Sequence, residues 1–255
     1  MTTWNANQYD NFTADRKRPG LDLLAQIPPR DFKRIVDLGC GTGFLTTQLH
    51  ERYPISELIA IDSSPQMLAK ARTLAPKINW REGDVNSLDI DNIDLLYSNA
   101  VLHWLDNHET VFPKLLTHLA PQGVFAFQLP NNFQQPSHQH MLDVIKSGPW
   151  KEKLLPLWRP EPTYSATWYY NLLAPLCQTL TIWETTYYQE LRGDNPVVEW
   201  TKGTWLRRFL NQLDTTEQQS FIDSYSQLIA NSYPAEKNGI TLFPFKRLFI
   251  IGVRD

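Results

Sequence analysis

Residues 34–43 read Arg-Ile-Val-Asp-Leu-Gly-Cys-Gly-Thr-Gly, an apolar run that passes directly into a turn with three glycines. Apolar residues at helical spacing follow at Phe44, Leu45 and Leu49, so the stretch predicts a buried strand, a tight turn and a helix. Glycine adopts positive φ readily and lets a ligand approach the backbone without a Cβ in the way. A plain turn needs only one glycine, and three favour a turn that seats a nucleotide-like ligand.

The spacing of the glycines excludes two common phosphate-binding turns. The dinucleotide fingerprint Gly-x-Gly-x-x-Gly needs its third glycine at the position of Phe44. A P-loop needs Gly-Lys-Ser or Gly-Lys-Thr after the turn, and neither follows here. A nicotinamide dehydrogenase and a P-loop nucleoside triphosphatase are therefore both disfavoured.

Composition indicates an ordinary globular chain. Of its 255 residues, 42% are hydrophobic and 20% are charged. The net charge of −3 offers no basic field for a phosphate backbone, so we expect no nucleic-acid partner. No apolar stretch approaches the length of a membrane span, so we expect no membrane partner. Cys40 and Cys177 stand far apart, which predicts no metal site and no disulfide framework, and fits a reducing cytoplasm.

Predicted strands and helices alternate along the chain. The strands are expected at residues 34–38, 57–61, 77–81, 93–97, 124–127, 179–188 and 248–253. The helices are expected at residues 5–26, 43–53, from 65 onward, 108–119, 166–175, 195–212 and 215–231. This alternation predicts an α/β fold with a doubly wound parallel sheet. Thr215 or Thr216 is expected to cap the last helix, with Glu217 in its first turn.

The chain is expected to divide into three parts. Residues 1–30 form an N-terminal helical lid, and residues 31–187 with 241–255 form the ligand-binding domain around the sheet. Residues 188–240 form a helical substrate cap, because two helices between the last two strands cannot lie in the sheet. The proline-rich stretch 131–163 is expected to be an irregular excursion with one helix that belongs with this cap.

Polar residues end successive predicted strands at Asp37, Asp62, Asp84 and Asn99. In an open α/β sheet, ligands lie beyond the carboxyl ends of the strands. A carboxylate at Asp62 can accept both hydroxyls of a ribose; the alternative, a helix cap, is already supplied by Ser63-Ser64. Asp84 can accept from an adenine amine, with the backbone of Val85 beside it, and Asp37 is expected to hold the glycine turn or an ammonium group.

With Asp37 in front of its glycines, the turn resembles the first motif of class I S-adenosylmethionine-dependent methyltransferases. The resemblance implies a seven-stranded, mostly parallel Rossmann-like sheet with a reversed final strand, and S-adenosyl-L-methionine as the cofactor. Met67 is expected to pack on the adenine or to be an ordinary core residue. Cys40 is expected to be a small filler and not a nucleophile. The residues expected at the cofactor are Tyr9, Arg16, Asp37, Gly39, Cys40, Gly41, Gly43, Asp62, Ser63, Met67, Asp84, Val85 and Asn99.

Stretches along the whole chain resemble the trans-aconitate methyltransferase family. They are Trp4-Asn5, Arg16–Pro19, Asp37–Gly43, Ile61–Met67, Ser98–Leu105, Trp183–Tyr188, Thr204–Arg207 and Phe245–Phe249. The later stretches are the more discriminating, because class I enzymes vary most there. This resemblance implies methyl-ester formation on a small polycarboxylic acid. It also favours an N-terminal lid in which Tyr9, Phe12 and Arg16 share one helix face, with simple packing on the sheet as the alternative.

A carboxylic acid is already ionised at neutral pH, so the implied reaction needs no general base. Arginines are expected to hold the carboxylates that do not react, and weaker donors to orient the one that does. Each arginine could instead lie on a solvated face of the cap. Of two consecutive tyrosines in a strand, alternation lets only one face the site. The histidine could instead act as a catalytic base. The residues expected at the acceptor are His103, Trp104, Tyr187, Tyr188, Arg207 and Arg247.

Two other functions stay open at this point. One is a class I methyltransferase that acts on another acid, such as a malonyl thioester in biotin synthesis; it would need a basic surface for an acidic carrier protein. The other is a cofactor-binding protein without turnover, which the cationic residues Lys202, Arg207 and Arg208 disfavour. The expected partner is a small carboxylic acid, with no obligate protein partner.

Overall fold

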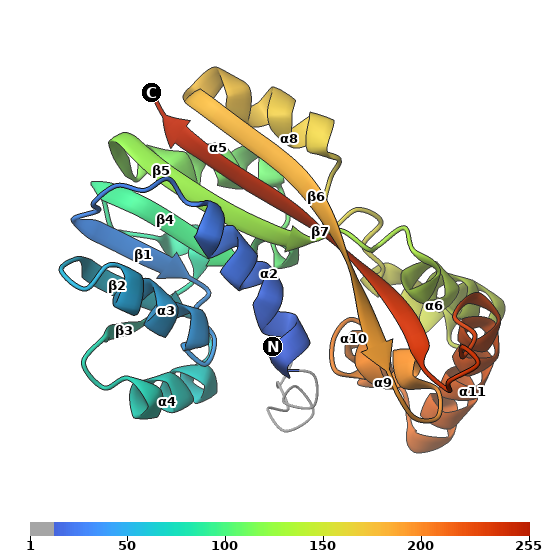
Figure 1. The fold of residues 1–255 in the computed structure, drawn as a ribbon. Coiled ribbons are helices and arrows are strands. Elements are labelled where there is room, and N and C mark those ends of the chain that lie inside the picture. The colour runs from blue at the N-terminus through green and yellow to red at the C-terminus, as the bar shows by residue number, and fades with distance from the viewer. Residues whose placement is uncertain (1–12) are drawn as a thin grey trace. The chain divides into compact units, whose positions relative to one another are not determined.

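The computed structural model describes residues 13–255, with side chains from residue 17 onward. Tyr9 and the first part of the expected helix at residues 5–26 therefore lie outside the described residues. The described chain falls into two compact units (Figure 1). We call residues 17–130, 162–185 and 247–255 the sheet unit, and residues 131–161 with 186–246 the helical unit. The stretch 131–161 thus packs with the helices of residues 186–246.

Seven strands form one sheet in the order β3-β2-β1-β4-β5-β7-β6. Their bounds are β1 Arg34–Leu38, β2 Glu57–Asp62, β3 Asn79–Glu82, β4 Ile93–Asn99, β5 Leu119–Pro130, β6 Cys177–Leu191 and β7 Thr241–Arg254. Strands β1 to β5 pair in parallel, and β7 runs antiparallel to β5. The predicted doubly wound sheet with a reversed final strand is confirmed. β6 and β7 are longer than expected because both continue into the helical unit.

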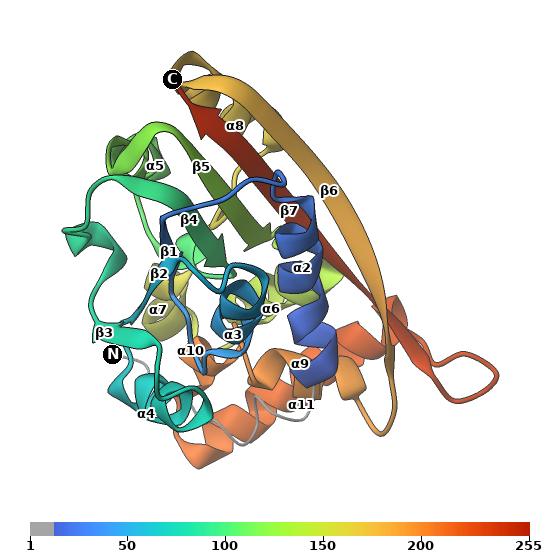
Figure 2. The same cartoon turned by 60° about the vertical axis from the view of Figure 1, so that its left-hand side comes forward.

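Helices cover both faces of the sheet (Figure 2). The helices of this unit are α2 Thr13–Gln26, which belongs to it from Lys17 onward, α3 Phe44–Arg52, α4 Pro65–Leu74, α5 His108–Thr117 and α8 Ala166–Leu173. The apolar residues of α5 and α8 pack with alternate residues of the strands into one buried core, which includes Leu96, Phe125 and Phe127. Burial of this contiguous apolar surface is the main source of stability for the unit.

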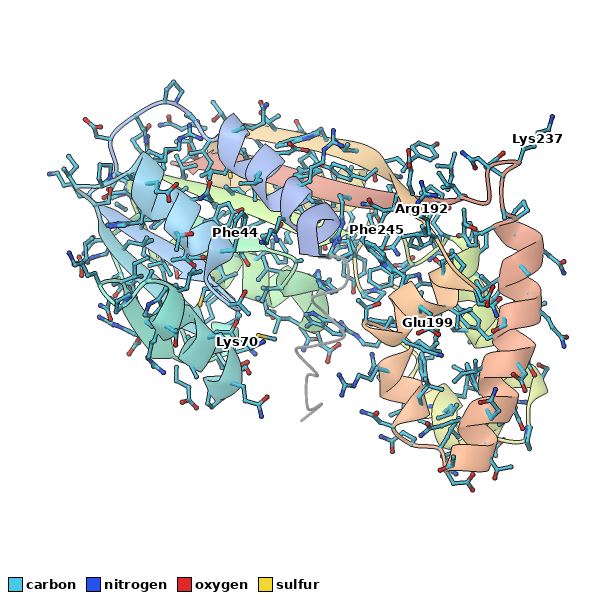
Figure 3. The ribbon with its side chains drawn as sticks, turned by 60° about the horizontal axis from the view of Figure 1, so that its bottom comes forward. Phe44, Lys70, Arg192, Glu199, Lys237 and Phe245 are labelled. Atoms are coloured by element: carbon cyan, nitrogen blue, oxygen red, sulfur yellow. The ribbon has the colours of Figure 1, made fainter. Side chains whose placement is uncertain are left out.

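Helix α2 is fixed against α3 and β4 by close contacts. The hydroxyl of Tyr97 donates to the carbonyl of Gly20 at 2.8 Å. A Cβ at Gly20 would lie 2.3 Å from Cδ1 of Leu45, so any larger residue there would have to displace the Leu45 side chain. The ammonium of Lys17 lies 4.0 Å from the ring centroid of Phe44, which Figure 3 marks at the start of α3. Phe44, where a dinucleotide site would have glycine, is therefore a packing residue for α2.

The helical unit has a separate core. Its helices are α6 Pro136–Ser147, α7 Lys151–Leu154, α9 Pro196–Lys202, α10 Arg207–Leu210 and α11 Thr215–Ser232. Trp200, Tyr225 and Phe243 are buried in this core. The hydroxyl of Tyr225 donates to the carbonyl of Ser137 at 2.6 Å, which ties α11 to the first turn of α6. Between residues 13 and 255 we find no helix with both the length and the apolar character needed to cross a membrane.

Two expectations about the helical unit were wrong. The single helix expected at residues 195–212 is two helices, because α9 ends at Gly203 and the chain turns before α10 begins. The cap of α11 is Asp214 and neither Thr215 nor Thr216. Its carboxylate accepts the backbone N–H of Glu217 at 2.9 Å, and the Glu217 carboxylate accepts the N–H of Asp214 at 3.0 Å. This reciprocal pair is a capping box, which satisfies two backbone donors at the start of the helix.

Asp214→Ala should lower the free energy of unfolding by about 1 kcal/mol, because it removes the N-cap of α11. Thr215→Ala, at the neighbouring exposed position, is the matched control and should change stability little. Urea unfolding of both variants checks the assignment. A larger loss for Thr215→Ala would contradict it.

Candidate functional site

The glycine turn after β1 is held by backbone hydrogen bonds to the end of β2. The N–H groups of Gly39 and Cys40 both donate to the carbonyl of Ile61, at 2.8 and 3.0 Å. The N–H of Gly43 donates back to the carbonyl of Cys40 at 3.0 Å, which closes the turn before α3 begins. The turn is therefore a fixed feature of the carboxyl edge of the sheet.

The three glycines are needed for different reasons. All have positive φ, at 79° for Gly39, 56° for Gly41 and 86° for Gly43. A Cβ at Gly39 would lie 2.1 Å from a methyl of Val101, and one at Gly43 would lie 2.5 Å from the ring of Trp80. A Cβ at Gly41 would meet no described atom within 4 Å. Positions 39 and 43 thus serve packing, whereas Gly41 leaves open space at the turn where a ligand can approach the backbone.

The carboxylate of Asp62 joins this turn to the start of the next helix. Its Oδ2 accepts the N–H of Gly41 and its Oδ1 accepts the N–H of Ser64, each at 2.8 Å. Ser64 is the N-cap of α4 and its hydroxyl accepts the N–H of Met67 at 3.4 Å. Ser64 therefore supplies the helix cap, while the Asp62 carboxylate ties the glycine turn to the start of α4. Two carboxylate oxygens offer about four acceptor positions, so those beyond the two in use remain for a ligand.

Asp37 is buried beneath the turn. Its Oδ2 accepts the hydroxyl of Thr46, in the first turns of α3, at 2.6 Å. Burial raises the pKa of Asp37 to about 7 and the nearby charge of Asp62 adds to the rise, while the Thr46 hydrogen bond opposes it. A nearby cation would stabilise the ionised form of Asp37. Burial also raises the pKa of the Cys40 thiol far above its usual range, so Cys40 has none of the thiolate character of a nucleophile.

The ends of β3 and β4 continue the row of polar residues. Asp84 is exposed and caps the short helix Val85–Ser87, where its Oδ1 accepts the N–H of Asn86 at 2.8 Å. The preceding residue, Gly83, donates to the carbonyl of Asp62 at 3.1 Å. Asn99 is the last residue of β4, and its Oδ1 is buried without a hydrogen-bond partner among the described residues.

Three residues expected at the acceptor also belong to the sheet unit. His103 is buried and Trp104 is partly exposed, and the centroids of their rings are 4.7 Å apart in the short helix Leu102–Trp104 that follows β4. Arg247 is buried on β7, where it lies opposite Pro130 at the end of β5. These residues therefore share the carboxyl edge of one sheet with Asp37, Asp62 and Asn99.

The remaining acceptor candidates belong to the helical unit. Tyr187 is 5% exposed and Tyr188 is 67% exposed, so the strand alternation places one inside and one outside. Arg207 is half-buried at the start of α10, and the guanidinium of Arg208 lies 4.9 Å from the ring centroid of Trp205. The backbone of Arg16 lies in α2, but its side chain is outside the described residues. Tyr187, Tyr188 and Arg207 remain candidates by expectation.

Two further polar residues, Thr46 and Gln128, were not predicted from the sequence. Nothing local marks Thr46, because its partner Asp37 lies nine residues earlier on a different element. Gln128 carries the signal that selected Asn99, a polar residue at the end of an apolar strand, and the two are paired in the sheet.

Comparison with known proteins decides the family. Residues 35–123 match the family described as a methyltransferase domain. A trans-aconitate 2-methyltransferase of Azoarcus sp. (strain BH72) is 41% identical over 255 residues, which is 100% of both chains. One of Yersinia pseudotuberculosis is 40% identical over 253 residues and 98% of both chains. The chain belongs to the trans-aconitate methyltransferase family. The predicted resemblance is confirmed, and for this family both the sheet unit and the helical unit lie within the matched length.

Solved structures confirm the fold of the family. A methyltransferase-like protein of Bacillus halodurans covers 92% of this chain with a TM-score of 0.60 at 12% identity. A phosphoethanolamine N-methyltransferase of Haemonchus contortus, in complex with S-adenosyl-L-methionine, covers 93% with a TM-score of 0.55 at 13% identity. At such low identity the likeness establishes the class I, Rossmann-like arrangement only.

Asp37→Asn should stabilise the protein more at higher pH. Because burial raises the pKa of Asp37 from 3.8 to about 7, the wild type loses stability as the pH rises through this window. An asparagine does not titrate and can still accept from Thr46, so its stability advantage should grow by roughly 2–3 kcal/mol between pH 5 and about pH 7 and then level off. Urea unfolding between pH 5 and 8 measures it.

The matched control for this series is Asp89→Asn, which removes the charge of an exposed aspartate. A stability difference between Asp37→Asn and wild type that stays constant from pH 5 to 8 would show that Asp37 is ionised throughout.

Proposed function

We propose that this chain is an S-adenosylmethionine-dependent carboxyl O-methyltransferase that forms the monomethyl ester of trans-aconitate. The observation that carries the proposal is the 41% identity to a trans-aconitate 2-methyltransferase over the full length of both chains. Full coverage matters because it includes the helical unit, where the substrate-binding part of class I enzymes is expected. A role in a reducing cytoplasm is part of the proposal and is supported by the two unpaired cysteines, Cys40 and Cys177.

The residues at the carboxyl edge fit the proposed cofactor. Gly41 leaves space at the turn, Asp62 has acceptor positions for ribose hydroxyls, and Asn99 presents a buried oxygen without a partner in the described chain. Asp37 and Asp62 place negative charge where a cationic molecule would be favoured. Bound S-adenosylmethionine supplies a methyl group activated by its sulfonium. Met67, Asp84 and Val85 are proposed at the adenine.

The acceptor side of the proposal needs positioning and exclusion of water more than proton transfer. Carboxylic acids have pKa values near 4, so the acceptor arrives as a carboxylate at neutral pH. We assign Arg207 and Arg247 to the carboxylates that do not react, because guanidinium pairs carboxylate with two parallel hydrogen bonds. Tyr187 and Trp104 are assigned as weaker donors. His103 is assigned to the lining of the site and not to the role of a base.

The assignment of Asp62 to the ribose makes a binding prediction. Asp62→Ala should weaken the binding of S-adenosylhomocysteine at least tenfold, about 1.4 kcal/mol. The two ribose hydroxyls would lose their acceptor, and the N–H of Gly41 would lose its hydrogen bond to the carboxylate. Titration calorimetry measures the affinity and thermal melting checks the fold. Ser64→Ala removes the helix cap and leaves the carboxylate in place, so it serves as the control. Unchanged affinity in Asp62→Ala would rule out the ribose assignment.

The proposed activity is tested with a panel of acids and a labelled methyl donor. Trans-aconitate should give the highest kcat/KM among di- and tricarboxylic acids, and mass spectrometry of the product should locate one methyl ester. The panel should include a malonyl thioester, because a higher kcat/KM for it would show that the enzyme has a different acceptor. Absence of labelled ester from every acid would overturn the proposal.

A further inference from the structure

Gln128 is a buried polar residue in an apolar strand. It follows Val-Phe-Ala-Phe at residues 124–127 on β5 and is 1% exposed. Neither its Nε2 nor its Oε1 has a hydrogen-bond partner within the described chain. Buried amides are nearly always paired, and an unpaired one lowers stability. A leucine or valine would suit the strand better, so the amide needs a reason outside the packing of the strand.

The neighbouring strand presents a second unpaired oxygen at the same level. Asn99, the last residue of β4, is the parallel partner of Gln128, and its Oδ1 is also buried without a described partner. Tyr97, two residues before Asn99, lies on the face of the sheet that α2 covers, since its hydroxyl reaches Gly20. By the alternation of strands, Asn99 and Gln128 lie on this face too. Three unpaired polar atoms therefore gather at one end of one face.

The third neighbour is positively charged. In the antiparallel pair of β5 and β7, Gln128 lies opposite Phe249 and Pro130 lies opposite Arg247. Gln128 and Arg247 are thus diagonal neighbours on one face, which are typically about 7–8 Å apart. Arg247 is buried, so its charge acts in a medium that screens it poorly. An anion close to Gln128 would be stabilised by this charge.

We propose that Gln128 is a binding residue for the acceptor, whose Nε2 donates to the carboxylate that becomes methylated; the proposal rests on the proposed function. Because the acceptor carries more than one carboxylate, Arg247 can pair with one that does not react while the amide of Gln128 donates to the one that does. A neutral amide is a weaker donor than a guanidinium, so it orients the reacting oxygen while withdrawing less of its electron density. An amide at the reacting carboxylate and a guanidinium at its neighbour suit an acid that must be held and still react.

A carboxylate at this place has two sources, the acceptor acid and the amino-acid end of the cofactor. The order of strands favours the acceptor. The proposed cofactor contacts, Asp84, Asp62 and Asn99, lie at the ends of β3, β2 and β4, the strands from the β3 edge of the sheet to the far neighbour of β1. Gln128 is one strand further, on β5, and Arg247 is on β7 beyond it. Neighbouring strands are about 4.8 Å apart, so each step along this edge leads away from the ribose position.

The test compares Gln128→Leu and Gln128→Glu with wild type. Gln128→Leu removes both polar atoms at nearly constant volume, and Gln128→Glu keeps the shape but places a carboxylate against the acceptor. Gln178→Leu, at an exposed position of β6, is the matched control. Three quantities are measured: KM and kcat with trans-aconitate, the calorimetric affinity for the acid in the presence of S-adenosylhomocysteine, and the affinity for S-adenosylhomocysteine alone.

Gln128→Leu should raise the KM and the Kd for the acid ten- to hundredfold, with a larger effect for Gln128→Glu, and leave the cofactor affinity within twofold. Its melting temperature should stay equal or rise, because an unpaired amide has been replaced by an apolar group. Weakened cofactor affinity with unchanged acid affinity would overturn the assignment to the acceptor. Unchanged affinities for the acid and for S-adenosylhomocysteine would also overturn the assignment. Gln128 would then be a buried residue that binds only water.

These measurements distinguish a failure of the Gln128 inference from a failure of the proposed function. If wild type methylates no acid of the panel but binds one, the methyltransferase proposal fails, and the Gln128 variants still show whether this amide holds the acid. If wild type binds no acid, the inference fails with it. Normal turnover of trans-aconitate by Gln128→Leu overturns the inference alone.

Discussion

The contact on which the site depends is the carboxylate of Asp62, which holds the N–H of Gly41 with one oxygen and the N–H of Ser64 with the other. One side chain at the end of β2 thereby fixes the turn after β1 and the first turn of α4. Charge-assisted hydrogen bonds of this kind are about twice as strong as neutral ones. The turn needs such support, because glycine loses more conformational freedom on folding than any other residue.

The same arrangement creates an electrostatic cost. Asp37 lies buried next to the charged Asp62, and burial together with that neighbour raises its pKa to about 7. Its one described side-chain hydrogen bond, from Thr46, offsets only part of this. The buried Asp37 and the half-buried Asp62 are poorly balanced in the protein alone and would be balanced by a cation. This is the physical reason why the sulfonium and ammonium of the proposed cofactor suit this turn better than a pyrophosphate, which would add negative charge.

Much of the sheet unit could be predicted from the sequence because its signals are local. An apolar run, a glycine turn and a helix start follow one another within ten residues, and polar residues mark the ends of the strands. The sequence says less where distant residues decide. Residues 131–163 were expected to belong with the cap, but the way residues 131–161 pack with 186–246 depends on contacts between segments far apart, such as Tyr225 with Ser137. The cap at Asp214 was missed because a capping box depends on a pair of side chains, and Thr215 alone looked sufficient.

Gln128 shows what only the structure could add. In the sequence Gln128 is a single polar residue after an apolar run, and many such residues simply end a strand. The structure shows that β5 continues past it to Pro130 and that its amide is buried beside Asn99 without a partner in the described chain. A residue that costs stability and is not needed for packing is best explained by the ligand it meets. The same reasoning separates Gln128 from Asp62, whose oxygens already hold the fold together, so that loss of Asp62 confounds folding with binding and loss of Gln128 does not.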